Sequence, residues 1–142
     1  MRSLSLVALA LLTGCAHSRR TVSTDQAPRA IGPYSQAVAV GDLVLVSGQI
    51  ALDPATGNMV EGDIREQTDR ALRNIAAVLA AAGLSMKHIA RTTVYMVDLG
   101  EFEAMNRVYA TWFPDSPPAR ATVQVAALPK GARIEIDAIA HR

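Results

Sequence analysis

The sequence predicts an α+β fold in which one β-sheet carries two helices on the same face. Two kinds of hydrophobic pattern support this prediction. Several short stretches alternate apolar and polar residues, which is typical of half-buried strands. Two longer stretches place apolar residues at helical spacing. Their order along the chain is strand, strand, helix, strand, helix, strand, strand. This order favours a single sheet with both helices on one face.

The first half of the domain is expected to begin with a β-hairpin. Residues 35–40 and 43–47 form two strands, joined at a Gly41-Asp42 turn of the kind common in hairpins. The first helix should start after Asp63, whose side chain caps it together with an acidic residue three positions later. A helical stripe of apolar residues follows, and Gly83 ends the helix.

The second half supplies one more helix and three strands. Residues 88–98 are rich in β-branched side chains and predict a strand. Residues 101–113 place large apolar side chains on one helical face, and Pro114 stops this helix. Two alternating stretches, 119–125 and 133–140, flank a Pro-Lys-Gly loop and predict the closing pair of strands.

The closing strands carry the first candidate site. If they pair as a hairpin, Arg120 and Glu135 lie on the face away from the core, with Thr122 opposite Glu135. Arg120 is then a diagonal neighbour at roughly 7–8 Å. An arginine can hold a planar carboxylate through two parallel hydrogen bonds, and a glutamate can orient or deprotonate a water molecule. An exposed cross-strand ion pair explains the same pattern without a function.

The amino-terminal segment predicts export. Residues 1–14 contain one arginine and then a short apolar run, far below the roughly 20 residues of a membrane-spanning helix, which fits a secretory signal. The last residues, Leu12-Thr13-Gly14-Cys15, resemble a bacterial lipobox. Cys15 is the only cysteine, so no intramolecular disulfide is possible. A plain signal peptide with an incidental cysteine is the alternative.

Acylation of Cys15 would place the mature protein on the periplasmic side of a bacterial membrane. Ala16 resembles the residue that follows the cysteine in lipoproteins of the outer membrane, so we expect that location. Residues 15–26 would form a flexible tether, and residues 27–142 the folded domain. In cell fractionation the native chain should remain with membranes and Cys15→Ser should not; identical partition of both would contradict lipidation.

Charge and motif content exclude several classes of function. The chain has 14 basic and 13 acidic residues, and loss of Arg2 with the signal leaves 13 of each. This balance gives no electrostatic basis for binding nucleic acid. The chain lacks a glycine-rich phosphate loop, an HExxH motif and a GxSxG elbow. Its three histidines are far apart in sequence, so no metal site is expected.

Several short motifs resemble the RidA (YjgF) family of enamine and imine deaminases. In chain order they are Ala30-Ile31-Gly32-Pro33-Tyr34-Ser35-Gln36-Ala37, Val46-Ser47-Gly48-Gln49-Ile50, Gln67-Thr68, Asn74-Ile75, Asn106-Arg107-Val108-Tyr109, Pro118-Ala119-Arg120 and Ile134-Glu135-Ile136. The similarity covers about residues 28–140, nearly all of the mature domain. It implies a chorismate-mutase-like α+β fold with a mixed sheet. It also implies a homotrimer with the sheets inside, the helices outside and a ligand cleft at each subunit interface.

The resemblance also implies roles for individual residues. Arg120 matches the arginine that binds the substrate carboxylate, Glu135 the glutamate that helps to position the attacking water, and Tyr34 a tyrosine of the cleft. The implied substrate-binding residues are Ser47, Gly48, Asn106 and Thr122. Thr122 stands where some relatives of the family carry a cysteine. This difference weakens a role in redox or thiol chemistry more than a role in hydrolysis, because the backbone at Thr122 can still contact a water molecule.

Some of these residues also have purely structural explanations. Tyr34 fits a packed aromatic after a Gly-Pro turn, Ser47 and Gly48 fit a tight strand end, and Asn106 fits a solvated helix position.

The implied activity is hydrolysis of small 2-imino or enamine acids, of the 2-iminobutanoate and 2-iminopropanoate type, to 2-keto acids and ammonia. Protonated imines are already reactive, so no cofactor is needed. The alternative is a non-catalytic trimeric module that binds small carboxylates in the same cleft. The usual imine sources are pyridoxal-phosphate enzymes of the cytoplasm, whereas the signal predicts export, and this mismatch keeps the alternative open.

Overall fold

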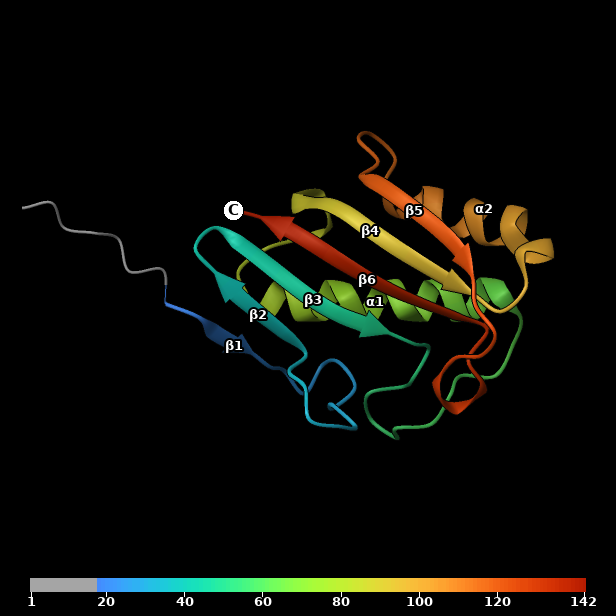
Figure 1. Cartoon of the computed structure of the whole chain (residues 1–142), viewed down its shortest axis with the longest axis horizontal. Coiled ribbons are helices and arrows are strands. Elements are labelled where there is room, and N and C mark those ends of the chain that lie inside the picture. The colour runs from blue at the N-terminus through green and yellow to red at the C-terminus, as the bar shows by residue number, and fades with distance from the viewer. Residues whose placement is uncertain (1–17) are drawn as a thin grey trace, which may run out of the picture.

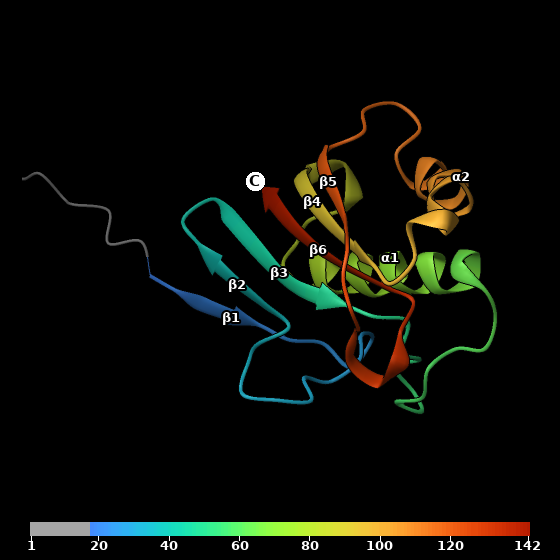
Figure 2. The ribbon, with the colours of Figure 1, turned by 45° about the vertical axis from the view of Figure 1, so that its right-hand side comes forward.

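A mixed six-stranded sheet carries both helices on one face (Figure 1, Figure 2). The structure is a computed structural model that describes residues 18–142. It confirms the predicted α+β class and the placement of both helices. The signal at residues 1–14 and the lipidation site Cys15 lie outside the described residues and stay predictions. None of the helices between residues 18 and 142 combines the length and hydropathy needed to cross a membrane.

The sheet order is β1-β2-β3-β6-β4-β5. The strands are β1 (Arg20–Val22), β2 (Ala37–Val40), β3 (Leu43–Gln49), β4 (Ile89–Met96), β5 (Ala119–Gln124) and β6 (Ile134–His141). Every neighbouring pair is antiparallel except β4 and β5, which run parallel. β5 therefore forms one edge of the sheet, and β1 forms the other.

Local signals in the sequence determine where the helices begin and end. The helices are α1 (Ile64–Ala81) and α2 (Phe102–Trp112), with short 3-10 turns η1 (Met86–His88), η2 (Leu99–Glu101) and η3 (Pro129–Gly131). The Asp63 side chain accepts a hydrogen bond from the Arg65 N–H, and Glu66 accepts one from the Asp63 N–H. This is the expected capping box. Gly83, with φ +78°, follows α1 in the left-handed conformation that glycine adopts freely.

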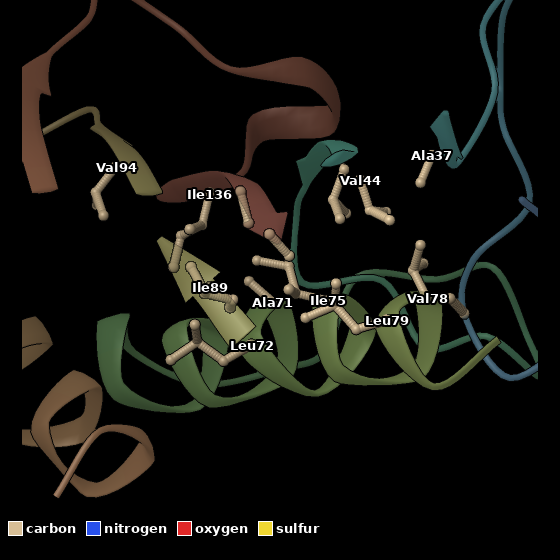
Figure 3. Packing of buried hydrophobic residues seen from close by; sticks show 14 of the residues in the cluster. Ala37, Val44, Ala71, Leu72, Ile75, Val78, Leu79, Ile89, Val94 and Ile136 are labelled. Atoms are coloured by element: carbon tan, nitrogen blue, oxygen red, sulfur yellow. The ribbon is translucent and has the colours of Figure 1, made fainter. Parts of the chain in front are cut away.

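The hydrophobic core lies between the helices and one face of the sheet (Figure 3). Leu72, Ile75 and Leu79 of α1 are completely buried against it. From the sheet, Ile134 and Ile136 of β6 are also completely buried. Burial of each large aliphatic side chain contributes roughly 1.5–3 kcal/mol. The alternation predicted for the last strand is therefore confirmed, and its charged residues face the opposite, open side of the sheet.

The two closing strands do not pair with each other, so the predicted hairpin register is wrong. β4 lies between them and pairs Thr92 with Arg120 on one side and Tyr95 with Glu135 on the other. Thr122 pairs with Val94 and not with Glu135. The physical reason is that α2 connects β4 to β5, and a helical crossover joins parallel strands.

The faces of β5 are also the reverse of those expected. Arg120 pairs with Thr92, whose hydroxyl forms a hydrogen bond with the Tyr109 hydroxyl of α2. Thr122 pairs with Val94, which is completely buried in the core. Arg120 and Thr122 thus lie on the helix-bearing face, and the residues between and after them lie on the open face. The edge position of β5 explains this, because an arginine there can reach solvent beside α2.

Residues 20–22 form an edge strand where part of a flexible tether was expected. β1 pairs with β2 in antiparallel register. Gln36, only 5% exposed, donates through its amide to three main-chain carbonyls between residues 24 and 28. Its side-chain oxygen accepts from the Thr24 N–H. The folded domain therefore begins before Ala27, and the tether expected over residues 15–26 is wrong where the chain is described.

Candidate functional site

The site residues predicted from the sequence fall into two groups on opposite faces of the sheet. Tyr34, Ser47, Gly48 and Glu135 line a pocket of about 520 Å³ on the open face. Asn106 and Arg120 line a shallower hollow beside α2. Thr122 lies on the helix-bearing face, two residues after Arg120. One chain thus brings together four of the seven residues at one place and two at another.

Glu135 places a half-buried carboxylate in the open-face pocket. Its neighbours Ile134 and Ile136 point into the core, so its carboxylate points away from the helices. Burial raises the pKa of Glu135, and the nearby charge of Asp137 raises it further. In residues 18–142 the Glu135 carboxylate takes part in no ion pair. A half-buried carboxylate with a raised pKa is suited to accept a proton from a water molecule.

Gly48 of β3 leaves the space that the Glu135 carboxylate occupies. A Cβ atom at Gly48 would lie 2.7 Å from the carboxylate carbon and would overlap one of its oxygens. Gly48 does not have a positive φ angle. The absence of a side chain at Gly48, and not its backbone conformation, therefore leaves room for the Glu135 carboxylate, which a larger residue would displace.

We expect Gly48→Ala to displace the Glu135 carboxylate and to lower catalysis while the fold is kept. A displacement of about 1 Å at a reacting group can cost roughly 10²-fold in rate. Steady-state kinetics and thermal melting of the variant would measure both effects. The control is the double variant with Glu135→Gln, in which Gly48→Ala should cause little further loss. A full additional loss in that background would show that Gly48 acts elsewhere.

The loop before β2 carries Tyr34 to the rim of the pocket. Tyr34 is 48% exposed, and its hydroxyl oxygen accepts a hydrogen bond from the Ile31 N–H at 3.3 Å. The Ser47 hydroxyl donates to the Ser35 carbonyl at 2.7 Å, and the Ser47 N–H donates to the Gln36 carbonyl at 3.0 Å. Ser47 therefore attaches the Tyr34 loop to the end of β3, and its hydroxyl proton is already used there.

Arg120 rests on an aromatic platform formed by α2. Its guanidinium carbon lies 4.6 Å from the ring centre of Tyr109 and 5.6 Å from that of Phe102. The Tyr109 hydroxyl is fixed by a 2.7 Å hydrogen bond with the Thr92 hydroxyl. The two rings hold the guanidinium through cation–π attraction, which does not use its N–H donors. Arg120 forms no ion pair within residues 18–142, so the cross-strand pair with Glu135 is absent.

Asn106 and Thr122 are the other two predicted site residues near the helix-bearing face. Asn106 is partly exposed on α2 and lines the hollow that Arg120 borders. The Thr122 hydroxyl is buried and has no hydrogen-bond partner within the described chain. An unpaired buried hydroxyl costs free energy unless another molecule satisfies it.

Sequence reasoning missed the contribution of three residues to these sites. It treated Phe102 and Tyr109 as core residues, although both also support Arg120. It did not identify Asp137, which lines the Glu135 pocket. The alternation of β6 could have indicated Asp137, because residues two apart on a strand share a face. No cluster of three or more potential metal ligands occurs in the part of the chain that the structure describes.

Comparison with known proteins gives one consistent family. Residues 24–142 match the family model described as Endoribonuclease L-PSP. The chain is 55% identical over 125 residues to the protein DfrA of Myxococcus xanthus, covering 87% of this chain and 95% of that protein. It is 48% identical over 122 residues to the 2-iminobutanoate/2-iminopropanoate deaminase of Mus musculus, covering 86% of this chain and 90% of that protein.

A solved structure extends the similarity to three dimensions. The crystal structure of E. coli TdcF with bound serine matches this chain with a TM-score of 0.83 and 43% sequence identity. The match covers 87% of this chain and 98% of TdcF.

Proposed function

This chain belongs to the endoribonuclease L-PSP (RidA) family, and from that membership we propose that it hydrolyses small 2-imino acids to 2-keto acids and ammonia. The proposed substrates are of the 2-iminobutanoate and 2-iminopropanoate type, as in the name of the mouse relative. The observation that carries the proposal is a pair of ionic groups without ion-pair partners in the described chain, Arg120 on its aromatic platform and Glu135 in its pocket. The endoribonuclease activity in the family's description has no support from the balanced charge of the chain.

The chemistry needs one group for the carboxylate and one for the water. Arg120 binds the substrate carboxylate through two parallel hydrogen bonds. Glu135 accepts a proton from water as the water oxygen attacks the C=N carbon of the protonated imine, whose nitrogen becomes an amine as the double bond is lost. Glu135 then returns that proton to the amine nitrogen. The C–N bond breaks, ammonia leaves, and Glu135 takes the hydroxyl proton of the adduct as the carbonyl of the keto acid forms, and releases it to ammonia or solvent. Holding the water and the imine in contact supplies much of the rate gain.

The site is proposed to form between two copies of the chain. Arg120 and Glu135 lie on opposite faces of the sheet, so one small ligand cannot touch both within one chain. The open face also exposes large apolar side chains, among them Leu45 at 43% and Val123 at 42%. A second copy would remove this surface from water. The homotrimer implied by the family resemblance would bring Arg120 of one chain near Glu135 of another and would also cover the exposed apolar side chains.

Subunit mixing tests the shared site. Arg120→Ala and Glu135→Gln chains should each be inactive alone, and mixed trimers should regain activity. In a cyclic trimer each mixed assembly contains one site with both native residues, so random equal mixing restores about one quarter of the sites. Light scattering and mass spectrometry would establish trimer formation and exchange. Exchange without recovered activity would contradict the shared site, and a monomer at micromolar concentration would contradict the trimer.

The reaction itself is tested by keto-acid formation from an imine generated in solution, against a buffer control. A chain of residues 18–142 keeps β1 and its contacts. Hydrolysis above the buffer rate is expected.

The second candidate function is a binding module for small carboxylates in the same cleft. The serine bound to the similar TdcF structure favours it, because serine is an amino acid and not an imine. The predicted export, away from the usual imine sources, also favours it. Keto-acid binding without any acceleration of imine hydrolysis would select this alternative.

A further inference from the structure

The pocket that holds Glu135 contains a second carboxylate. Asp137 lies two residues further along β6, and Ile136 between them is completely buried on the other face. Both carboxylates therefore face the open side of the sheet, and both line the same pocket. The proposed hydrolysis uses Glu135 and gives Asp137 no part.

Asp137 is fixed by two hydrogen bonds from β4. Its Oδ1 atom accepts a hydrogen bond from the Thr93 N–H at 3.1 Å, and its Oδ2 atom accepts one from the Tyr95 hydroxyl at 3.0 Å. In the β4–β6 register, Thr93 is opposite Asp137 and Tyr95 is opposite Glu135. The Thr93 N–H and the Tyr95 hydroxyl thus hold the Asp137 carboxylate in place. The Glu135 carboxylate has no ion-pair partner in residues 18–142.

Few other charged groups face Glu135. The charged and titratable side chains that line the pocket from neighbouring elements are Arg29, Tyr34 and Arg91. Tyr95 of β4 is opposite Glu135 in the strand register. The pocket residues that come from β3 and from η3 are uncharged. Arg29 forms an exposed ion pair with Asp25, with 3.3 Å between a guanidinium nitrogen and the Oδ1 atom. The negative charge nearest to Glu135 along its own strand face is that of Asp137, and this charge adds to burial in raising the pKa of Glu135.

We propose that Asp137 is a positioning residue for the hydrolysis, which strengthens Glu135 as the base through a fixed negative charge. The inference rests on the proposed function, in which Glu135 accepts the proton of the attacking water. Two neighbouring carboxylates resist being ionised together. Because Thr93 and Tyr95 hold the Asp137 carboxylate, the unpaired Glu135 binds a proton more tightly. A stronger base removes a proton from water more efficiently.

The experiment measures the protonation of Glu135 directly, by NMR titration. The effect of Asp137 on the rate of hydrolysis is measured separately. The full chain is labelled with ¹³C at the glutamate side-chain carboxyl, and the Glu135 signal is identified by its absence in Glu135→Gln. Titration is compared among the native chain, Asp137→Asn, Asp137→Glu and Asp42→Asn. Asp42, exposed at the β2–β3 turn, provides a matched loss of one negative charge elsewhere. Asp137→Ser serves as a second neutral variant if Asp137→Asn does not fold.

The native chain should show a Glu135 midpoint above the ordinary glutamate value. That midpoint should fall in Asp137→Asn, return towards the native value in Asp137→Glu and stay unchanged in Asp42→Asn. The acidic limb of kcat/KM should move with it, and kcat should fall a few-fold, well short of the roughly 10²–10⁴-fold expected when the base itself is lost.

An unchanged Glu135 midpoint in folded neutral variants overturns the proposal, even if their activity falls, because a merely structural role would lower the rate without moving the titration. A shifted midpoint in a protein that hydrolyses no imine leaves the coupling of the two carboxylates intact and overturns the proposed function instead.

Discussion

Replacing Glu135 by glutamine is expected to remove most turnover and to leave ligand binding nearly unchanged. The amide keeps the shape of the side chain but loses its negative charge and its basicity. Loss of a general base typically costs roughly 10²–10⁴-fold in rate. Imine hydrolysis and keto-acid binding, measured side by side on the same preparation, would separate the two effects. Glu61→Gln is the matched control, because Glu61 is exposed in the loop before α1.

The pH dependence of the native chain gives a second view of the same residue. Burial raises the pKa of Glu135 above its ordinary value. Because only the ionised carboxylate can accept a proton, kcat/KM should fall as the pH drops through that raised pKa. The acidic limb should therefore lie above the range of an ordinary glutamate. The residual rate of Glu135→Gln should lack this limb, and a variant with the native rate and profile would contradict the assignment.

Replacing Arg120 by lysine is expected to impair the protein almost as severely as replacing it by alanine. A lysine ammonium is a compact charge and cannot offer two parallel donors, and it lacks the planar group that Arg120 places over Tyr109 and Phe102. Two hydrogen bonds to a charged carboxylate together contribute about 3 kcal/mol, or roughly 10²-fold in affinity. Titration with a keto acid and the KM for imine hydrolysis would measure this loss.

Two controls delimit the role of Arg120. Arg107→Lys makes the same change at an exposed arginine of α2 and should have little effect. Thr122→Ala should also have little effect on turnover, since only the backbone of Thr122 is expected near the water. Equal activity of the native chain and Arg120→Ala would show that the carboxylate is bound elsewhere.

The parts of the fold that depend on local signals could be predicted from the sequence. The capping box at Asp63 and the glycine at residue 83 mark both ends of α1, because capping is decided within a few residues. The alternation of β6 predicted its buried isoleucines, because one sheet face meets the helices. The pairing of β5 could not be predicted this way. Alternation shows that a segment is a strand but does not identify the neighbouring strand.

The candidate site shows the same limit. Motif matches indicated Arg120 and Glu135 individually, but their arrangement depends on which strand lies between β5 and β6. A hairpin would have put both side chains on one face. With β4 inserted and β5 at the edge beside α2, Arg120 is on the helix-bearing face and Glu135 on the open face. Long-range topology therefore separates two residues that the sequence alone had placed together.

If the proposed site is shared between chains, activity depends on the amount of assembled protein and not on the total amount of chain. A solitary chain holds Arg120 and Glu135 in hollows on opposite faces of the sheet, where no single small ligand reaches both. Under the proposed mechanism, the specific activity should therefore decline on dilution below the concentration at which chains associate. A substitution that only blocks association would silence the enzyme while leaving every ligand-contacting side chain in place.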